Sequence, residues 1–328
     1  MLQSHEPIFS LREPDRSNMS SHFESSPRSV SGFHTTAVLF RSSILAGLFL
    51  ILGFLQPILI GQEKPAEGSD KGAASALQKP YPLDAVVTKD GTVLIVDRNL
   101  PGIWKKTDAG LSVFVQGSKR LREPLNACRC LALTADDALI VGDSATRDVY
   151  RIDAAGKPEA ITGGKIGIPV DLAVSSDGTI YVADLETRSV LKIAAGTKEP
   201  TSFAKMNARG ISLDASGNLW VVTQDTEQLV KVDASGKAEA IVKERVFNFP
   251  HQVSVNAAGE AFVTDGYEKA VWKVAPGKAP EKWFQGEPLV NPVGTTWAGD
   301  KLIVVDPRAS TLFQFDAEAK ISPWIEVR

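Results

Sequence analysis

The feature that most constrains this chain of 328 residues is a sequence unit that recurs about every 40 residues. The clearest copy is Val170–Ile193, VDLAVSSDGTIYVADLETRSVLKI. Short apolar runs, separated by a tight turn at Asp177-Gly178 and by a polar loop, predict three strands in this copy. A weaker fourth strand is predicted near Thr201–Ala204. Each copy therefore predicts one small sheet.

Each copy also closes its second strand in a similar way, most often on an aspartate. These positions are Asp97, Asp143, Asp184, Thr223, Asp265 and Asp306, and neighbouring ones are 39 to 46 residues apart. Four strands per unit at this period are typical of a β-propeller, because a sheet with two apolar faces is stable only when it packs between other sheets. Six copies predict an all-β fold, a six-bladed β-propeller of four-stranded blades over residues 81–328.

The recurring aspartates favour a structural role over catalysis, since one catalytic site needs only one copy. We expect each to cap backbone N–H groups of the loop that follows it, with Thr223 doing this more weakly. Because four strands can be assigned to every blade in the same order, the ring is expected to close by packing between blades one and six. The alternative is that residues near Ala73–Leu77 add to the last blade.

The residues before the propeller fall into three stretches. Residues 1–36 are polar and predicted to be disordered, and residues 62–80 are predicted to form a linker. Between them, residues 37–61 contain the apolar run Ser43–Ile60 just after Arg41, which predicts a signal peptide or a membrane anchor. Both forms predict an exported protein, periplasmic or extracellular, that meets the membrane only through this N-terminal segment.

Charge and cysteine content exclude several classes of function. A net charge of −3 and a pI near 5.9 imply no strongly basic face, which argues against nucleic acid as a partner. Cys128 and Cys130 are two residues apart, so in a regular strand they point to the same face and are expected to be small buried residues rather than a disulfide or a zinc site.

The repeats resemble those of NHL-repeat propellers and of the related regucalcin/gluconolactonase, or senescence-marker-protein-like, family. The segments that carry the resemblance are Ile168–Val174, IPVDLAV, and Ile211–Trp220, ISLDASGNLW, and it extends over residues 81–328. Metal-dependent lactonases of that family hold a divalent cation with oxygen ligands, and the resemblance offers Asp171 and Asp84 for that role. Arg209 stands where such a site needs an anionic ligand, so no metal or other cofactor is predicted unless the lactonase hypothesis holds.

Candidate site residues cluster where each innermost strand begins, the face on which propellers usually bind ligands. These residues are Asp84, Arg129, Asp171, Arg209, His251 with Gln252, and Asn291. Acidic and basic residues alternate in this set, so it predicts either a site for a polar or anionic ligand or a ring of ion pairs that lines the channel.

Three functions follow from these residues. The favoured one is an exported binding or scaffold module that holds a small molecule, peptide or glycan at the channel mouth. The second is a gluconolactonase-like hydrolase with a divalent cation near Asp84 and Asp171, in which Asp171 is a catalytic candidate. The third is a lyase with His251 as general base, which requires an acidic partner; a multi-histidine zinc site is excluded because His5, His22 and His34 all precede the propeller.

Overall fold

The computed structural model describes residues 79–328, which form 24 strands arranged in six antiparallel sheets. The strands are β1 (Pro82–Val87), β2 (Val93–Asp97), β3 (Gly102–Thr107), β4 (Gly110–Gln116), β5 (Cys128–Leu133), β6 (Leu139–Asp143), β7 (Asp148–Ile152), β8 (Pro158–Ala160), β9 (Pro169–Val174), β10 (Ile180–Asp184), β11 (Ser189–Ile193), β12 (Pro200–Lys205), β13 (Ala208–Leu213), β14 (Leu219–Thr223), β15 (Leu229–Val232), β16 (Ala238–Val242), β17 (Pro250–Val255), β18 (Ala261–Asp265), β19 (Ala270–Val274), β20 (Glu281–Gln285), β21 (Gly294–Ala298), β22 (Lys301–Asp306), β23 (Thr311–Phe315) and β24 (Ile321–Glu326).

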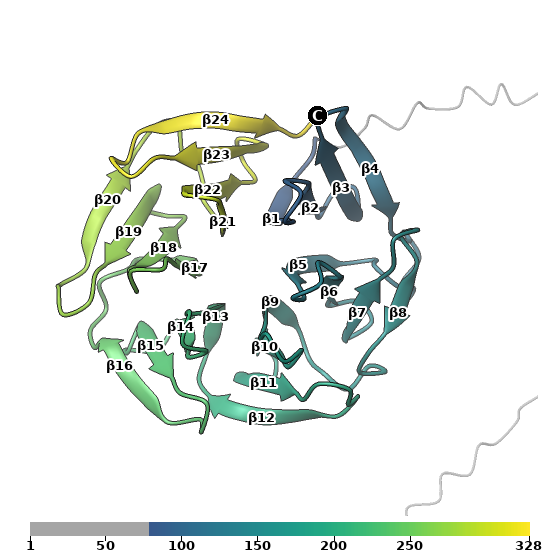
Figure 1. Cartoon of the computed structure of the whole chain (residues 1–328), viewed down its shortest axis with the longest axis horizontal. Coiled ribbons are helices and arrows are strands. Elements are labelled where there is room, and N and C mark those ends of the chain that lie inside the picture. Colours follow the sequence, from purple (N-terminus) through teal and green to yellow (C-terminus); the bar gives the residue numbers. More distant parts are fainter. Residues whose placement is uncertain (1–78) are drawn as a thin grey trace, which may run out of the picture. The chain divides into compact units, whose positions relative to one another are not determined.

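Each sheet consists of four consecutive strands, and the six sheets surround a central axis as the blades of a propeller (Figure 1). The innermost strands are β1, β5, β9, β13, β17 and β21, and the fourth strand of each blade lies at the rim. The predicted all-β, six-bladed fold with four-stranded blades is therefore confirmed.

The ring closes by packing between blades one and six, as the complete set of strands predicts. β24 completes blade six from the end of the chain, and an apolar cluster joins the two blades through side chains such as Ile95, Ile303 and Ile325. The Ser310 hydroxyl also donates a 2.8 Å hydrogen bond to the Pro80 carbonyl. Within the described part of the chain, no strand from outside residues 294–326 joins the last sheet; Ala73–Leu77 lie outside it.

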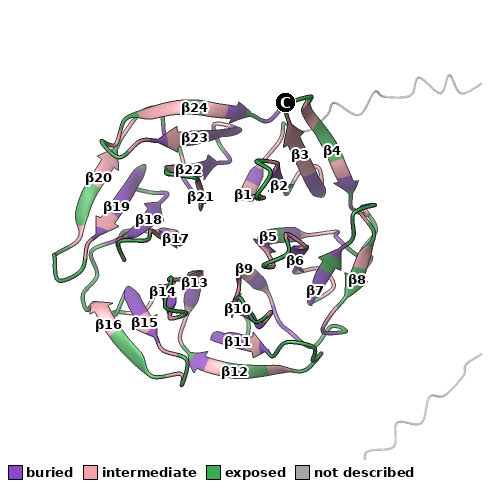
Figure 2. Ribbon diagram, viewed as in Figure 1, coloured by how far each residue is buried: buried purple, intermediate pink, exposed green. Residues whose placement is uncertain are grey.

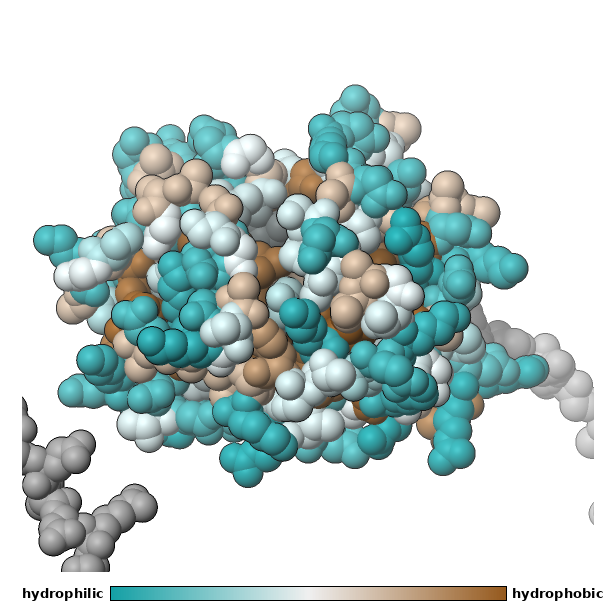
Figure 3. Space-filling view, turned by 60° about the horizontal axis from the view of Figure 1, so that its bottom comes forward, coloured by the Kyte–Doolittle hydropathy of each residue, from teal (hydrophilic) through white to brown (hydrophobic). Residues whose placement is uncertain are grey.

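Burial decreases outward along each blade. The second strands β2, β6, β10, β14 and β18 are buried at every residue, whereas outer strands such as β8 and β16 consist mostly of exposed and half-buried residues (Figure 2). Apolar clusters lie between neighbouring blades, which is why a single blade has no core of its own. On the surface in Figure 3, hydrophilic side chains predominate and hydrophobic ones appear in the recesses between them.

The recurring aspartates cap loops as expected, and they also fasten the chain that enters each blade. The Asp97 carboxylate accepts N–H bonds from Asn99 and Leu100 in the following loop, at 2.7 and 3.1 Å, and from Tyr81 before β1, at 3.1 Å. In blade four the Thr223 hydroxyl accepts the Asp225 N–H. The Asp225 carboxylate accepts the N–H of Asn207, which lies just before the innermost strand of this blade. The structural interpretation of the repeated aspartates is confirmed.

A β-bulge near the start of the innermost strand decides which residues face the channel. In blades one to five the register slips near the start of this strand. In blade two, Cys128 pairs with Asp143 and Cys130 with Gly142, so Arg129 is the extra residue. A bulge re-aims its extra side chain out of the sheet, and here it turns that side chain to the mouth of the channel.

The bulge also corrects the expectation that Cys128 and Cys130 point to the same face. Both thiols are free and buried, as expected, but Cys128 packs in the apolar cluster towards blade one and Cys130 in the cluster towards blade three. The extra residue Arg129 between them breaks the strict alternation of strand side chains.

The predictions for residues 1–36, residues 37–61 and nearly all of residues 62–80 lie outside the described residues. In the described part, no helix has the length and apolar character needed to cross a bilayer.

Candidate functional site

The bulged residues meet at one mouth of the channel, on the side of the loops that join second and third strands. There they line a cavity of about 210 Å³. Its lining residues are Tyr81, Leu83, Arg98, Arg129, Val170, Arg209, His251, Gln252, Asn291 and Val293. The residue types at the bulge therefore set the chemistry of this mouth, which is cationic because blades two and four place arginines there.

Three arginines line the mouth cavity without a carboxylate partner among the described residues. Arg129 Nε donates to the Ser144 hydroxyl at 3.0 Å, and an Arg209 terminal nitrogen donates to Gln224 Oε1 at 2.8 Å. Arg209 Nε is buried and has no partner. Burial and the charge of Arg129 both lower the pKa of Arg209, which is nevertheless charged at neutral pH. The mouth therefore carries positive charge that no side chain in the cavity wall neutralises.

His251 lies beside these arginines and is neutral at physiological pH. Burial, with a further contribution from the charge of Arg209, lowers the pKa of His251 to about 4. The Phe249 ring contacts His251 edge-on with 5.0 Å between ring centroids and also lies 5.8 Å below the Arg209 guanidinium. The exposed Tyr267 ring extends this aromatic wall, 5.1 Å from Phe249.

Gly266 is needed beside His251 because there is no space for a side chain. A Cβ atom at this position would lie 2.8 Å from Asn291 Oδ1 and 3.0 Å from His251 Nε2. Both polar atoms therefore reach the same place on the loop after β18. Asp265 precedes Gly266, but its carboxylate accepts the N–H groups of Asn248 and Phe249 and does not line the cavity.

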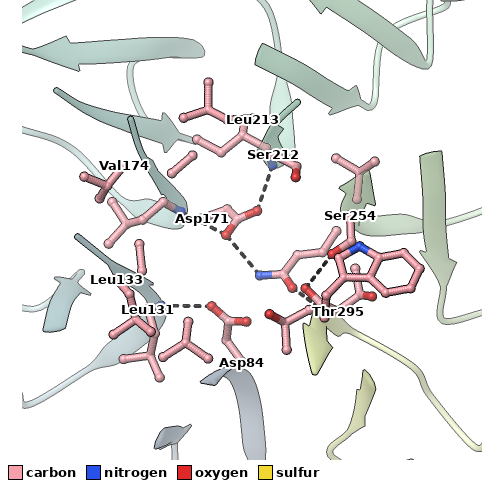
Figure 4. A pocket seen from close by; sticks show the side chains of 18 of the residues that line it. Asp84, Leu131, Leu133, Asp171, Val174, Ser212, Leu213, Ser254 and Thr295 are labelled. Atoms are coloured by element: carbon pink, nitrogen blue, oxygen red, sulfur yellow. Dashed lines mark hydrogen bonds between the residues drawn. The ribbon is translucent and has the colours of Figure 1, made fainter. Parts of the chain in front are cut away.

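Asp84 and Asp171 lie deeper in the channel, beyond the bulge, where they link neighbouring blades (Figure 4). Asp84 accepts the Leu131 N–H of blade two at 2.9 Å, and Asp171 accepts the Ile211 N–H of blade four at 2.7 Å. Gln252 makes the corresponding link from blade five to blade six through the Thr295 N–H, at 2.7 Å. Alternate blades thus supply a polar side chain that holds the next blade.

The blades that receive these links carry small residues at the same position. Cys130, Gly210 and Gly294 occupy it in blades two, four and six. A Cβ atom at Gly210 would lie 2.5 Å from the Gln252 Cα atom, and one at Gly294 would lie 2.7 Å from the Leu83 carbonyl oxygen. The close approach of the innermost strands therefore requires glycine at these two places.

The two buried carboxyl groups influence each other. Burial raises the pKa of Asp84 to about 6, and burial together with the charge of Asp84 raises the pKa of Asp171 well above its usual range. Gln252 Nε2 donates to Asp171 at 3.0 Å. Gln252 lines the cavities on both sides of this level, so it marks the boundary between the cationic mouth and the carboxyl half of the channel.

The structure splits the candidate set that the sequence places in a single ring. Arg129, Arg209, His251, Gln252 and Asn291 line the mouth, whereas Asp84 and Asp171 lie below it. The described residues do not form the alternative ring of ion pairs, because these two carboxylates accept backbone N–H groups and the two mouth arginines donate to Ser144 and Gln224.

Sequence reasoning missed Arg98 and Tyr81, which complete the mouth. The Arg98 guanidinium lies 5.1 Å over the Tyr81 ring, and both residues line the cavity. The signal that could have found Arg98 is that it directly follows the repeated Asp97, in the loop between second and third strands that is expected to face the ligand.

The donor set does not suit the divalent cation of the lactonase hypothesis. Both oxygens of Asp84 and of Asp171 already accept N–H bonds. Hard divalent cations need about six to eight oxygen ligands, and within residues 79–328 no group of three or more histidine, cysteine or acidic residues is placed to hold a metal. At the mouth the arginines repel a cation, so neither half of the channel fits a divalent metal.

Comparison with solved structures agrees with the fold. Virginiamycin B lyase from Staphylococcus aureus matches with a TM-score of 0.58 and 15% identity, over 76% of this chain and 85% of that one. A gluconolactonase from Xanthomonas campestris matches with a TM-score of 0.60 and 15% identity, over 70% and 84%. A chain of a nidogen–laminin complex matches with a TM-score of 0.59 and 17% identity, over 75% and 93%.

These structures define the class, a six-bladed propeller similar in fold to gluconolactonases, as the repeats predicted. Identities this low show a common fold and leave the activity open, since one of these proteins is a lyase, one a gluconolactonase and one part of a protein complex. No family model and no curated protein matches the chain. The function must therefore be argued from the site.

Proposed function

We propose that this protein is an exported binding propeller that holds an anionic group of a small molecule, peptide or glycan at the arginine mouth. The observation that carries the proposal is the convergence of Arg98, Arg129 and Arg209 on one cavity whose wall contains no carboxylate. Guanidinium groups bind carboxylate and phosphate with paired hydrogen bonds. A ligand anion supplies the negative charge that the cavity wall lacks.

The buried part of the mouth suggests how such a ligand is oriented. The cavity of about 210 Å³ accepts one anionic group rather than a whole drug-sized molecule. Arg209 Nε has no partner within the protein and is a donor available to the ligand. The rest of the ligand then lies towards the exposed Tyr267 ring, where an apolar or sugar face can stack.

Export is part of this proposal and rests on the sequence of residues 37–61. The apolar run after Arg41 has the order of a signal sequence, a positive residue followed by a hydrophobic stretch. A membrane anchor has the same consequence for the propeller, which is then placed in the periplasm or outside the cell. Detection of the protein in the cytosolic fraction alone, after fractionation of the producing cells, would contradict this part.

Isothermal titration of the purified full-length protein tests the binding proposal. The probes are D-glucuronate and inorganic phosphate, with neutral D-glucose as the control ligand. We expect the anions to bind, to bind more weakly at high salt, and to lose about tenfold in affinity in Arg129→Gln and in Arg209→Gln. The matched control is Arg151→Gln, because Arg151 pairs with Asp136 on the surface and does not line the mouth.

Two results would overturn the binding proposal. The first is the absence of heat for either anion at millimolar concentration. The second is equal affinity in all three arginine variants, which would place the anion elsewhere on the protein.

A second candidate, a lyase, is favoured by the position of His251. The neutral imidazole shares the cavity with Arg209, so it can take the proton next to a carboxylate that the arginine holds. The carbon–carbon double bond then forms as the bond to the leaving group on the β-carbon breaks, and that group departs with the electron pair. Virginiamycin B lyases share the fold, and a histidine-to-alanine variant of one of them is catalytically inactive.

Two observations place the lyase second. The pKa of about 4 makes His251 a weak base, and no acidic partner lines the mouth in the described residues. Turnover of a β-substituted carboxylate that is lost in His251→Gln, while anion binding is retained, would establish the lyase. Unaltered turnover in this variant would remove it.

A further inference from the structure

The other half of the channel holds a second cavity, of about 330 Å³, that the arginine mouth does not use (Figure 4). Its inner end carries the carboxyl groups of Asp84 and Asp171, which are only 3% and 4% exposed. None of its lining residues is a lysine, arginine or histidine. Two buried carboxyl groups therefore share one space without a cation, which is costly when either one ionises.

Besides the two carboxyl groups, which accept N–H bonds, this cavity contains a hydroxyl group that has no hydrogen-bond partner. Thr295 is 8% exposed and lines the cavity, and its hydroxyl oxygen is buried without a hydrogen bond. The backbone of the same residue is satisfied through Gln252 and Ser254. Buried hydroxyl groups rarely stay unpaired, so this oxygen is an independent sign that something polar belongs beside the two carboxyl groups.

Apolar side chains from all six blades also line this cavity, together with the polar residues Ser212, Ser254 and Thr296. Each innermost strand contributes one half-buried apolar residue near its end, and these residues form what we call the collar. The collar consists of Val86, Leu133, Val174, Leu213, Val255 and Trp297. A polar floor under an apolar collar matches a ligand with a charged head and a hydrocarbon body.

We propose that this half of the channel binds a primary alkylammonium group, with the ammonium at Asp84, Asp171 and Thr295 and the alkyl chain inside the collar. An ammonium group has three N–H donors, one for each of these acceptors. Trp297 in the collar adds a ring face that attracts a cation as it enters. The site is separate from the arginine mouth, and neither proposal depends on the other.

A metal ion fits this cavity less well than an ammonium group. The two carboxylates already accept N–H bonds, so they offer too few free lone pairs to replace the water shell of a hard cation. The collar also has no use in metal binding. The raised pKa values of Asp84 and Asp171 agree with carboxyl groups that hold a proton when no other cation is bound.

Titration of the full-length protein with n-butylammonium chloride tests the proposal. The control ligand is 1-butanol, which has a similar body without the charge, and calcium chloride tests the metal alternative. We expect butylammonium alone to bind and to raise the melting temperature. Nα-acetyl-lysine methylamide carries the same group on a peptide: if it binds as well, the natural ligand includes a lysine side chain, and if only butylammonium binds, it is a free amine.

Variants of Asp84 or Asp171 can fail to fold because these residues link neighbouring blades. A pair of variants at one collar residue avoids this difficulty. Leu213→Lys adds a tethered ammonium that reaches the floor, so butylammonium affinity should fall at least tenfold while phosphate binding at the mouth is unchanged. Leu213→Met has a similar volume without the charge, so it should lose far less butylammonium affinity than Leu213→Lys and thereby separates the effect of the charge from that of repacking the collar. Equal binding of 1-butanol, binding of calcium instead, or undiminished affinity in Leu213→Lys would each overturn the proposal.

Discussion

The two ends of the channel are built from neighbouring positions of the innermost strands, with the arginines on β5 and β13 and the aspartates on β1 and β9, and yet they have opposite chemistry. Arg129 and Arg209 at the bulge face the mouth, whereas Asp84 and Asp171, one position further along their strands, face the interior. The cations remain beside solvent, and the carboxyl groups are buried and bound to backbone N–H groups. The difference shows that the bulge, which is present in blades one to five, directs neighbouring positions of the innermost strands into two separate sites.

The titratable groups at the two ends also have pKa values that are shifted in opposite directions. At the mouth, burial and Arg209 hold His251 neutral, with a pKa near 4. In the interior, burial holds the Asp84 carboxyl protonated up to a pKa of about 6. Each group is thus kept uncharged by its surroundings, although one does so by losing a proton and the other by keeping one.

The largest effect is expected from a substitution that pushes two innermost strands apart between the arginine mouth and the carboxyl cavity. Gly210→Ala places a Cβ atom 2.5 Å from the Gln252 Cα atom and 2.6 Å from the His251 carbonyl oxygen. Neither backbone atom can move without shifting β17, so we expect a loss of about 3 kcal/mol or more in the free energy of unfolding, measured by urea denaturation. Ser212→Ala on the same strand is the control and should stay within about 0.5 kcal/mol. A stable Gly210→Ala protein with unchanged anion binding would show that the contact is not needed.

The pH dependence of stability is the next largest effect. Asp84 has a folded pKa above its usual 3.8, so its contribution is complete below pH 4 and is lost as the pH rises to about 6, by about 3 kcal/mol. His251 has a folded pKa below its usual 6.5, so its contribution is complete above that value and is lost as the pH falls towards 4. In the intact protein the two slopes oppose each other between pH 4 and 6.

Single variants separate the contributions of Asp84 and His251 to the pH dependence of stability. Relative to the intact protein, stability should rise more steeply with pH in Asp84→Asn and fall more steeply in His251→Gln, as measured by urea denaturation at pH 4, 5 and 6. The charge of Asp84 also raises the pKa of Asp171, so the difference for Asp84→Asn reports on the buried carboxyl pair, whereas the difference for His251→Gln reports on His251. Parallel curves would mean that neither group is shifted by its surroundings.

The sequence predicted the fold well because the repeat is a strong and redundant signal. Six spaced copies, each with its turn and its closing Asp97-type residue, fix the number of blades even where one copy departs, as at Thr223. The cap on the following loop was also predictable, since a short polar side chain after a strand has few other uses. The second bond, to the strand that enters the blade, joins positions about 16 residues apart and appears only in the structure.

The candidate site was predicted in content but not in arrangement. The innermost strand starts gave Arg129, Arg209 and His251 correctly as lining residues of the mouth. A regular strand gives no reason to separate Asp84 or Asp171 from them, because the bulge depends on pairing with the second strand and has no sequence signature in this chain. The collar was missed for the same reason: it is a property of six strand ends brought together.

Loss of one interblade link should have a smaller effect than the two changes above. Asp171→Ala leaves the Ile211 N–H and the Gln252 amide without their acceptor, but it also removes a carboxyl group that is costly to bury. We expect the net loss to be about 2 kcal/mol in urea denaturation at pH 7. Asp108→Ala, at an exposed turn, is the matched control and should be neutral. A more stable Asp171→Ala protein would show that the buried charge outweighs its hydrogen bonds.

The smallest effect tests whether the two ends are electrically separate. His251 is the only histidine of the propeller, so its NMR titration can be identified by comparison with His251→Gln. Burial is the main cause of the low pKa of His251 and Arg209 lowers it further, so Arg209→Gln should move this pKa up part of the way towards its usual value. Asp84→Asn should leave it unchanged, because Asp84 acts in the other half of the channel. If the Asp84 variant moved the His251 titration as much as the Arg209 variant does, the charges at the two ends would act as one field, and the mouth and the carboxyl cavity would have to be treated as a single site.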